Sequence, residues 1–240
     1  LTTLGLRGNE LESLPAEIVH LGNLTTLDLA SNDLGELPPE IVQLSGLRRL
    51  DLSENRLKTF PQEIVQLTDL TELDLDSNDL TELSTWITRL SGLKTLHLGG
   101  NSLRKFPEEL MSLTALVELD LSDNGLSSLP GEIAILGELA TLNLSGNDLS
   151  DLPGSMVNLA SLKTLYLNDN GLTSPPAAIF VLSGLTELHL SFNALETLPP
   201  ELMNLTTLER LYLDSNSLTE LPPVLISLPN LAELYLDSNE

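Results

Sequence analysis

Leucines recur along the whole chain with one fixed period of 23 residues. With the first leucine of each repeat taken as position 1, positions 1, 4 and 6 are leucine in all eleven repeats, and positions 11 and 21 are leucine in the ten complete ones. The repeats begin at Leu1, Leu24, Leu47, Leu70, Leu93, Leu116, Leu139, Leu162, Leu185, Leu208 and Leu231. A fixed period of this length predicts a solenoid, in which stacked repeats bury one continuous core.

Each repeat combines two hydrophobic spacings. The leucines at positions 4 and 6 point to one side of the chain and position 5 to the other, which indicates a short β-strand. Position 15 is proline in nine of the ten complete repeats, with Ser84 as the exception, and position 18 is always Ile, Leu or Met. Proline suits the start of a short helical or 3₁₀ turn. We therefore expect an α/β fold, a solenoid with a parallel β-sheet on the concave face and short 3₁₀ or α turns on the convex face.

Asparagine occupies position 9 of every repeat. Its amide group can both donate to and accept from unpaired backbone groups inside the turn that follows the strand. We therefore expect the stacked repeats to form a structural asparagine ladder. Its members are Asn9, Asn32, Asn55, Asn78, Asn101, Asn124, Asn147, Asn170, Asn193, Asn216 and Asn239.

The resulting frame, L-x-x-L-x-L-x-x-N-x-L-x-x-L-P-x-x-I-x-x-L-x-x, resembles the leucine-rich-repeat family over the whole chain. Its L-P-x-x-I variant is similar to the repeats of Ras-pathway scaffold proteins, Scribble-type scaffolds, plant intracellular Ras-group proteins, Roco GTPases and many bacterial repeat proteins. The resemblance implies a curved solenoid whose concave sheet binds proteins or peptides. Secreted receptors of the family usually carry cysteine-rich caps, which this sequence does not contain.

Ten full repeats and the first ten residues of an eleventh account for all 240 residues. We therefore expect residues 1–240 to form a single leucine-rich-repeat domain. Terminal repeats of a solenoid need a polar outer face for solubility, and neither end of this sequence carries such a cap. The sequence is therefore expected to be an excerpt of a longer protein.

Charge and composition exclude several classes of function. Acidic residues outnumber basic ones by 35 to 11, and the resulting net charge of −24 argues against nucleic acid or an anionic membrane as a partner. No apolar run is long enough to span a membrane. The sequence has no cysteine, so it contains neither a disulfide framework nor a thiolate zinc site.

Position 5, at the centre of each predicted strand, changes character along the chain. In the later repeats this column is aromatic and contains all three tyrosines of the sequence. Tyrosine combines a large apolar body with a polar tip and is enriched at binding hot spots. We therefore expect a concave-face binding stripe, against the alternative that the rings only brace neighbouring strands. The stripe consists of Tyr166, His189, Phe192, Tyr212 and Tyr235, with Phe192 at position 8 beside His189.

The same column is acidic in the earlier repeats. Its candidate binding residues are Asp28, Asp51, Asp74, His97 and Asp120, and further acids surround them at Glu54, Glu72, Asp76, Glu118 and Asp123. Like charges on neighbouring strands repel, so the column either serves a basic partner or is a solvated acidic face. Carboxylates also suit hard cations, but no loop has the ligand spacing of a calcium site. We therefore expect no metal.

Catalysis finds no support in the sequence. His20, His97 and His189 lie in separate repeats, and no Ser/His/Asp set, phosphate-binding glycine loop or HExxH motif occurs. We therefore expect no enzymatic activity and no cofactor within these residues.

These observations predict a protein-interaction module that binds a protein or peptide on its concave face, including partners with basic side chains. Two alternatives stay open: the regulatory repeat domain of a larger signalling enzyme, such as a Roco-type GTPase or a kinase, and an extracellular recognition domain. Asn143 begins an Asn-x-Ser/Thr sequon in the central column, where a glycan would obstruct the face. Together with the missing cysteines this favours the cytoplasm. The pattern does not specify an oligomeric state.

Overall fold

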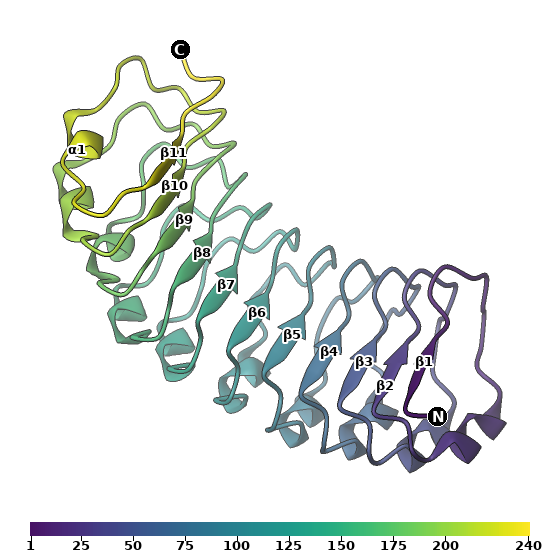
Figure 1. Ribbon diagram of the computed structural model, residues 1–240. Helices are drawn as coiled ribbons and strands as arrows, with labels where there is room; N and C mark the ends of the chain where they lie inside the picture. Colours follow the sequence, from purple (N-terminus) through teal and green to yellow (C-terminus); the bar gives the residue numbers. More distant parts are fainter. The chain divides into compact units, whose positions relative to one another are not determined.

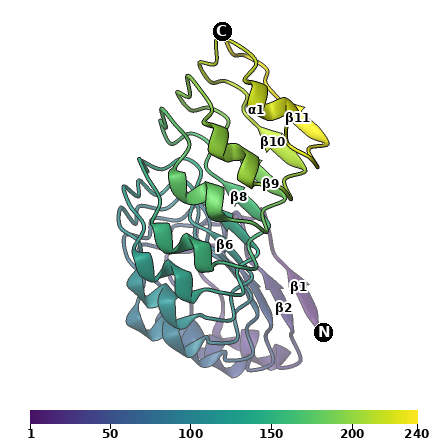
Figure 2. The same ribbon diagram turned by 90° about the vertical axis from the view of Figure 1, so that its left-hand side faces the viewer.

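The computed structural model describes residues 1–240. Its contacts divide the chain into two compact units: an N-terminal unit of Leu1–Leu103 and Pro107–Asp120, and a C-terminal unit of Arg104–Phe106 and Leu121–Glu240. Within each unit the strands and the helical turns lie on opposite sides of the repeats (Figure 1, Figure 2). The single domain expected for residues 1–240 stays a prediction.

Every repeat begins with a three-residue strand at positions 3–5, and neighbouring strands of a unit pair in parallel and in chain order. The register joins equivalent positions, so that Asp51 is level with Asp74 in one unit and Tyr166 with His189 in the other. The N-terminal unit contains β1 (Thr3–Gly5), β2 (Thr26–Asp28), β3 (Arg49–Asp51), β4 (Glu72–Asp74), β5 (Thr95–His97) and β6 (Glu118–Asp120). The C-terminal unit contains β7 (Thr141–Asn143), β8 (Thr164–Tyr166), β9 (Glu187–His189), β10 (Arg210–Tyr212) and β11 (Glu233–Tyr235).

Each complete repeat returns through one short helical turn. The turns of the N-terminal unit are η1 (Ala16–Leu21), η2 (Pro39–Gln43), η3 (Gln62–Gln66), η4 (Thr85–Arg89) and η5 (Glu108–Ser112). Those of the C-terminal unit are η6 (Gly131–Ile135), η7 (Gly154–Asn158), η8 (Ala177–Val181), η9 (Pro200–Asn204) and α1 (Pro223–Ile226). All are 3₁₀ helices except α1, a single α-helical turn. None of them is long and apolar enough to cross a membrane.

The leucine frame forms the core between strands and turns. Leu27 and Leu50, at position 4 of their repeats, have no exposed surface. Full burial of a leucine side chain contributes about 1.5–3 kcal/mol, and the frame repeats this contribution along the chain. Leu221 is an exception at position 14, where it is 55% exposed. The predicted fold class, a leucine-rich solenoid with a parallel sheet and short turns, is confirmed.

Proline fixes where the turns start. In nine turns a proline precedes the first helical residue, with φ between −55° and −74°. Because the pyrrolidine ring already holds φ in this range, the chain loses little freedom there on folding. Ser84 replaces proline before η4 with φ −75°, and its Oγ accepts the N–H of Trp86 at 3.3 Å. A side-chain cap thus takes the place of the ring.

The asparagines at position 9 connect each repeat to the one before it. The Nδ2 of Asn147 donates to the carbonyls of Leu144 in its own repeat at 3.0 Å and of Leu121 in the preceding repeat at 2.9 Å. Its Oδ1 accepts the N–H of Leu126 at 2.9 Å and of Asn124 at 3.2 Å. One side chain therefore satisfies backbone groups of two repeats in a region that water does not reach.

Most of the ladder is buried. The buried members are Asn32, Asn55, Asn78, Asn101, Asn124, Asn147, Asn170 and Asn216. Asn193 and Asn239 are half-buried. Asn9 is exposed and donates only within its own repeat, to the carbonyls of Leu6 and Arg7 at 2.8 and 3.4 Å.

The residue before each ladder asparagine has a left-handed backbone. All eleven residues at position 8 have φ between 51° and 71°. At Gly146 a Cβ would also meet the carboxylate of Asp123, so that side chain would have to move. Phe192 is the one large side chain in this set, with φ 57°. Such a conformation costs a residue other than glycine about 1–3 kcal/mol.

Candidate binding surface on the sheet

Four rings of the C-terminal unit form a continuous stack across β8 to β11. The ring of His189 lies between those of Tyr166 and Tyr212, with centroids 4.2 and 4.0 Å away. Tyr235 continues the stack at 4.6 Å from Tyr212, with an interplanar angle of 1°. The parallel register makes this possible because it places position 5 of each repeat level with position 5 of the next. The structure therefore brings four of the five predicted stripe residues together.

Phe192 stands apart from this stack. It follows β9 in the left-handed turn, and its side chain is 63% exposed without a ring contact. Its N–H donates to the carbonyl of Asp214 at 2.9 Å, so the backbone is held while the ring projects. Phe192 thus offers exposed apolar surface in the same repeat as His189 but outside the stack.

Charged side chains form hydrogen bonds with the polar atoms of the stacked rings and with each other. Glu187 accepts from Arg210 Nη2 at 2.6 Å and is 2.8 Å from Nε2 of His189. Burial raises the pKa of Glu187, but the hydrogen bonds from Arg210 and His189 outweigh this effect and the pKa is lowered overall. Burial lowers the pKa of His189. At the far end Tyr235 donates its hydroxyl hydrogen to Glu233 at 3.0 Å. The neutral rings are therefore flanked by a fixed pattern of charge.

The acidic column of the N-terminal unit has a structural role that the sequence analysis did not foresee. The side-chain oxygens of Asp28, Asp51 and Asp74 each accept the backbone N–H two residues later, at 3.0, 3.1 and 3.0 Å. Asp51 also accepts from the hydroxyl of Ser53 and is only 7% exposed. A short polar residue at a strand end, followed by a turn, is the signal that indicates such a local bond. One oxygen of each of these carboxylates is therefore already hydrogen-bonded to the backbone of its own repeat.

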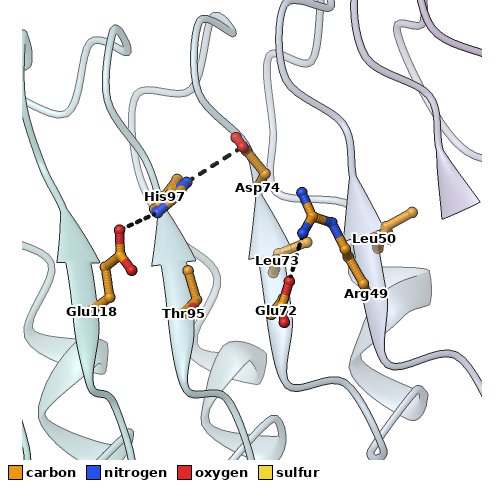
Figure 3. Close-up of a pocket in the computed structure, with 8 residues that line it drawn as sticks. All are labelled: Arg49, Leu50, Glu72, Leu73, Asp74, Thr95, His97 and Glu118. Atoms are coloured by element: carbon orange, nitrogen blue, oxygen red, sulfur yellow. Dashed lines mark hydrogen bonds and ion pairs between the residues drawn. The ribbon is translucent and has the colours of Figure 1, made fainter. Parts of the chain in front are cut away.

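An open pocket of about 310 Å³ lies on the sheet of the same unit, over β3 to β6. Figure 3 shows His97 at its centre between two carboxylates, and Arg49 paired with Glu72 beside it. Nδ1 of His97 is 3.4 Å from Asp74 Oδ2, and Nε2 is 3.1 Å from Glu118 Oε1. The residues that line the pocket are Arg49, Leu50, Glu72, Leu73, Asp74, Thr95, His97 and Glu118.

Two titratable groups in and beside this pocket, His97 and Asp76, have strongly shifted pKa values. The pKa of His97 is raised to about 9, first by its hydrogen bond with Asp74, although burial acts in the opposite direction. The pKa of Asp76, next to the pocket, is raised to about 7 by burial and by the charges of Asp74 and Asp120. Asp76 accepts the N–H of Gly99 at 2.5 Å. The N-terminal unit therefore concentrates negative charge around one imidazole.

The turn side carries features of a different kind. The ring of Trp86 is 48% exposed, and the guanidinium of Arg89 lies 4.7 Å from its centroid. Exposed apolar side chains recur there in five consecutive repeats of the C-terminal unit, at positions 19 or 20. They are Ile135, Val157, Val181, Met203 and Ile226. The sequence analysis missed this row, because positions 19 and 20 vary and lie outside the frame.

Comparisons with known proteins agree on the repeat type. A family model described as leucine rich repeat matches residues 22–80, 84–126, 116–172 and 183–240. A comparison with curated protein sequences gives no match. Among solved structures, a leucine-rich-repeat protein of Leptospira interrogans is 39% identical with a TM-score of 0.82, over 100% of this chain and 67% of that one.

Two further structures are complexes. The ectodomain of the Arabidopsis thaliana receptor kinase GASSHO1/SCHENGEN3, bound to CASPARIAN STRIP INTEGRITY FACTOR 2, is 31% identical with a TM-score of 0.77, and this chain spans only 30% of its length. A chain of the octameric complex of Latrophilin 3, Unc5D and FLRT2, the last contributing leucine-rich repeats, is 29% identical with a TM-score of 0.83, over 100% of this chain and 76% of that one. With the family model matching most of its length and a solved relative at 39% identity, the chain belongs to the leucine-rich-repeat family.

Proposed function

We propose that the chain is a protein-interaction module that binds a protein or peptide on the sheet of its C-terminal unit. The observation that carries the proposal is the stack of Tyr166, His189, Tyr212 and Tyr235, one ring from each of four consecutive strands. Adjacent strands lie roughly 4.8 Å apart, so the stack presents about 14 Å of aromatic surface. Large rings that are already ordered lose little side-chain freedom on binding, which suits them as anchors.

The stack could instead serve only to brace the sheet, since stacked rings stabilise neighbouring strands. Phe192 supports the binding interpretation, because it makes no ring contact and still occupies a backbone conformation that is costly for a large residue. An exposed aromatic ring kept at such a position adds nothing to the core. Beside the stack it enlarges the apolar area that a partner can cover.

The charges around the stack favour a partner with basic side chains. Arg210 is neutralised by Glu187 at 2.6 Å. Glu233, Asp214 and Asp237 leave the neighbourhood negative, as is the whole chain with its net charge of −24. Complementary charge steers a partner and selects among partners more than it adds affinity. We therefore propose an extended segment that carries both apolar and basic residues.

Related structures support a binding role rather than catalysis. The Arabidopsis receptor ectodomain is bound to CASPARIAN STRIP INTEGRITY FACTOR 2, and the plant peptide hormone receptor RGFR1, 36% identical to this chain, is bound to RGF2. A regulatory role within a larger signalling enzyme is the alternative. There the same surface would hold another domain of the enzyme.

The proposal includes a cytoplasmic location. Asn143 begins a sequon and is level with Tyr166 across β7 and β8, so a glycan on Asn143 would stand against the stack. The likeness to a receptor ectodomain favours the extracellular alternative. Secreting the chain from a eukaryotic cell, and then measuring its glycosylation at Asn143 and its binding, distinguishes the cytoplasmic from the extracellular location. Glycosylation at Asn143 with retained binding would contradict the cytoplasmic location.

Selection of ligands from a random peptide display library on the immobilised chain tests the binding function. The selected peptides are expected to combine aromatic or aliphatic residues with Lys or Arg. Hydrogen exchange with and without peptide should then show added protection in β8–β11. Protection confined to β2–β5 would place the ligand on the acidic column and overturn the proposed surface.

A further inference from the structure

We propose that Asp74, Asp76 and His97 of the N-terminal unit form a binding site for one divalent transition-metal ion, with Zn²⁺ as the best match. One donor atom of each residue lies within 4.8 Å of a donor atom of the other two. Asp74 is the last residue of β4, Asp76 follows two positions later on the same side of the chain, and His97 is level with Asp74 on β5. The sequence analysis expected no metal because it found no single loop with ligand spacing, whereas these ligands come from two repeats.

Each of the three residues can offer one donor atom, but Asp74 Oδ2 and His97 Nδ1 are paired with each other, so a metal ion would displace the proton between them. Asp74 Oδ1 accepts the N–H of Asp76 at 3.0 Å, and its Oδ2 faces Nδ1 of His97 at 3.4 Å. Asp76 Oδ1 accepts the N–H of Gly99 at 2.5 Å, which leaves its second oxygen. Donor atoms in a four-coordinate zinc site lie about 2.0–2.2 Å from the ion, so modest side-chain rotations would close the ligand set.

The second nitrogen of His97 is held by a carboxylate. Its Nε2 is 3.1 Å from Glu118 Oε1, on the neighbouring strand β6, and Figure 3 shows the ring spanning the space between Glu118 and Asp74. Metal-binding histidines commonly donate their other ring N–H to such a carboxylate, which fixes the tautomer and the ring orientation. This contact aims Nδ1 at the two aspartates. The pocket of about 310 Å³ on this side leaves room for a water or a partner's donor as a further ligand.

The charge at the site is unbalanced. Asp74 and Asp76 repel each other, and the cationic partner of Asp74 is the imidazole of His97 at 3.4 Å rather than a lysine or arginine. The nearest pocket arginine, Arg49, is bound to Glu72 at 2.9 Å. A divalent cation between the aspartates would remove this repulsion. One imidazole with two carboxylates suits Zn²⁺ better than Ca²⁺ or Mg²⁺, which prefer oxygen ligands alone.

Isothermal titration of the chelator-treated 240-residue chain with Zn²⁺ tests the site. We expect one Zn²⁺ per chain and a higher unfolding temperature with the ion than without it. Asp76→Asn and His97→Gln should each lower the affinity by about tenfold or more, and Glu118→Gln should lower it less. Without metal, Asp76→Asn should raise the unfolding temperature because it removes a repelled carboxylate. If Asp76 had only a structural role, Asp76→Asn would not lower the Zn²⁺ affinity and at the same time raise the unfolding temperature of the metal-free chain.

His20→Gln is the matched control, since it removes an exposed imidazole elsewhere on the chain and should leave the Zn²⁺ affinity unchanged. Circular dichroism establishes that each variant is folded, and Asp74→Asn replaces any variant that is not. Zn²⁺ binding that survives both Asp76→Asn and His97→Gln would overturn the proposal. Ca²⁺ binding as tight as Zn²⁺ binding and insensitive to His97→Gln would also overturn it, because that result indicates general attraction to an acidic face.

Discussion

The rings of His189 and Tyr212 lie face to face, with their centroids 4.0 Å apart and an angle of 6° between their planes. Adjacent strands in parallel register place them level, and Glu187 fixes the imidazole through Nε2 at 2.8 Å. A flat, ordered aromatic surface is thus built into the sheet before any partner arrives. Preordered side chains reduce the entropy that association costs.

The half-buried imidazole of His189 makes stability depend on pH. Its pKa is lowered below the ordinary value of 6.5 by burial, and Glu187 and Arg210 are the charged groups beside it. The unfolded chain therefore takes up a proton at a higher pH than the folded chain does. The contribution of the neutral ring is fully present above pH 6.5 and is lost as the pH falls through the lowered pKa.

Urea titrations of the wild type and of His189→Gln, between about pH 5 and pH 8, measure this contribution. The difference in unfolding free energy between them should shrink as the pH falls below 6.5. Titration of the groups that do not contact His189 cancels in the difference, and the pKa of Glu187, which does contact it, is lowered from 4.5 and lies outside this range. A difference that stays constant over this range would show that the folded and unfolded chains protonate His189 alike.

The asparagine ladder gives a prediction on stability. Asn147→Leu removes the partners of buried carbonyl and N–H groups in two repeats, so we expect it to lower the unfolding free energy by about 1–3 kcal/mol. Asn9→Leu is the matched control, since Asn9 is exposed and bonds only within its own repeat. Denaturant titration checks both. Equal losses for the two variants would mean that burial does not set the cost.

We expect Phe192 to lower the stability of the folded chain while it strengthens the binding of a peptide. Phe192→Asn places a residue that tolerates positive φ at this position, and should raise the unfolding free energy by about 1 kcal/mol. The same change removes exposed apolar area and should weaken a selected peptide. Thermal unfolding and titration of that peptide check the two halves. An Asn variant that is no more stable than the wild type would show that the left-handed backbone carries no strain.

The sequence was sufficient for the fold because each frame position has one physical role. The leucines at positions 4 and 6 predicted the strand and the core, and the proline at position 15 predicted the start of the turn. Register could also be predicted, since an unbroken period makes equivalent positions neighbours. The alignment of Tyr166, His189, Tyr212 and Tyr235 followed from that period alone.

Contacts that use positions outside the frame could not be predicted in the same way. The bonds of Asp28 and Asp74 to their own backbone depend on the turn geometry after the strand. The approach of Asp76 to His97 depends on side-chain rotamers in adjacent repeats. The repeat pattern also does not show that the chain divides into two compact units near Asp120, because the 23-residue period continues unchanged through that point.

The most direct test of the account is the affinity of one display-selected peptide for the double variant Tyr212→Ala/Tyr235→Ala, with circular dichroism to establish that the variant is folded. If the two rings are binding anchors, each loss should cost about 2 kcal/mol or more, and binding should fall by at least several hundredfold. Glu72→Lys/Glu118→Lys, on the sheet of the N-terminal unit, should leave the affinity within a few fold. A folded tyrosine variant with full affinity, together with loss of binding in the lysine variant, would contradict the account.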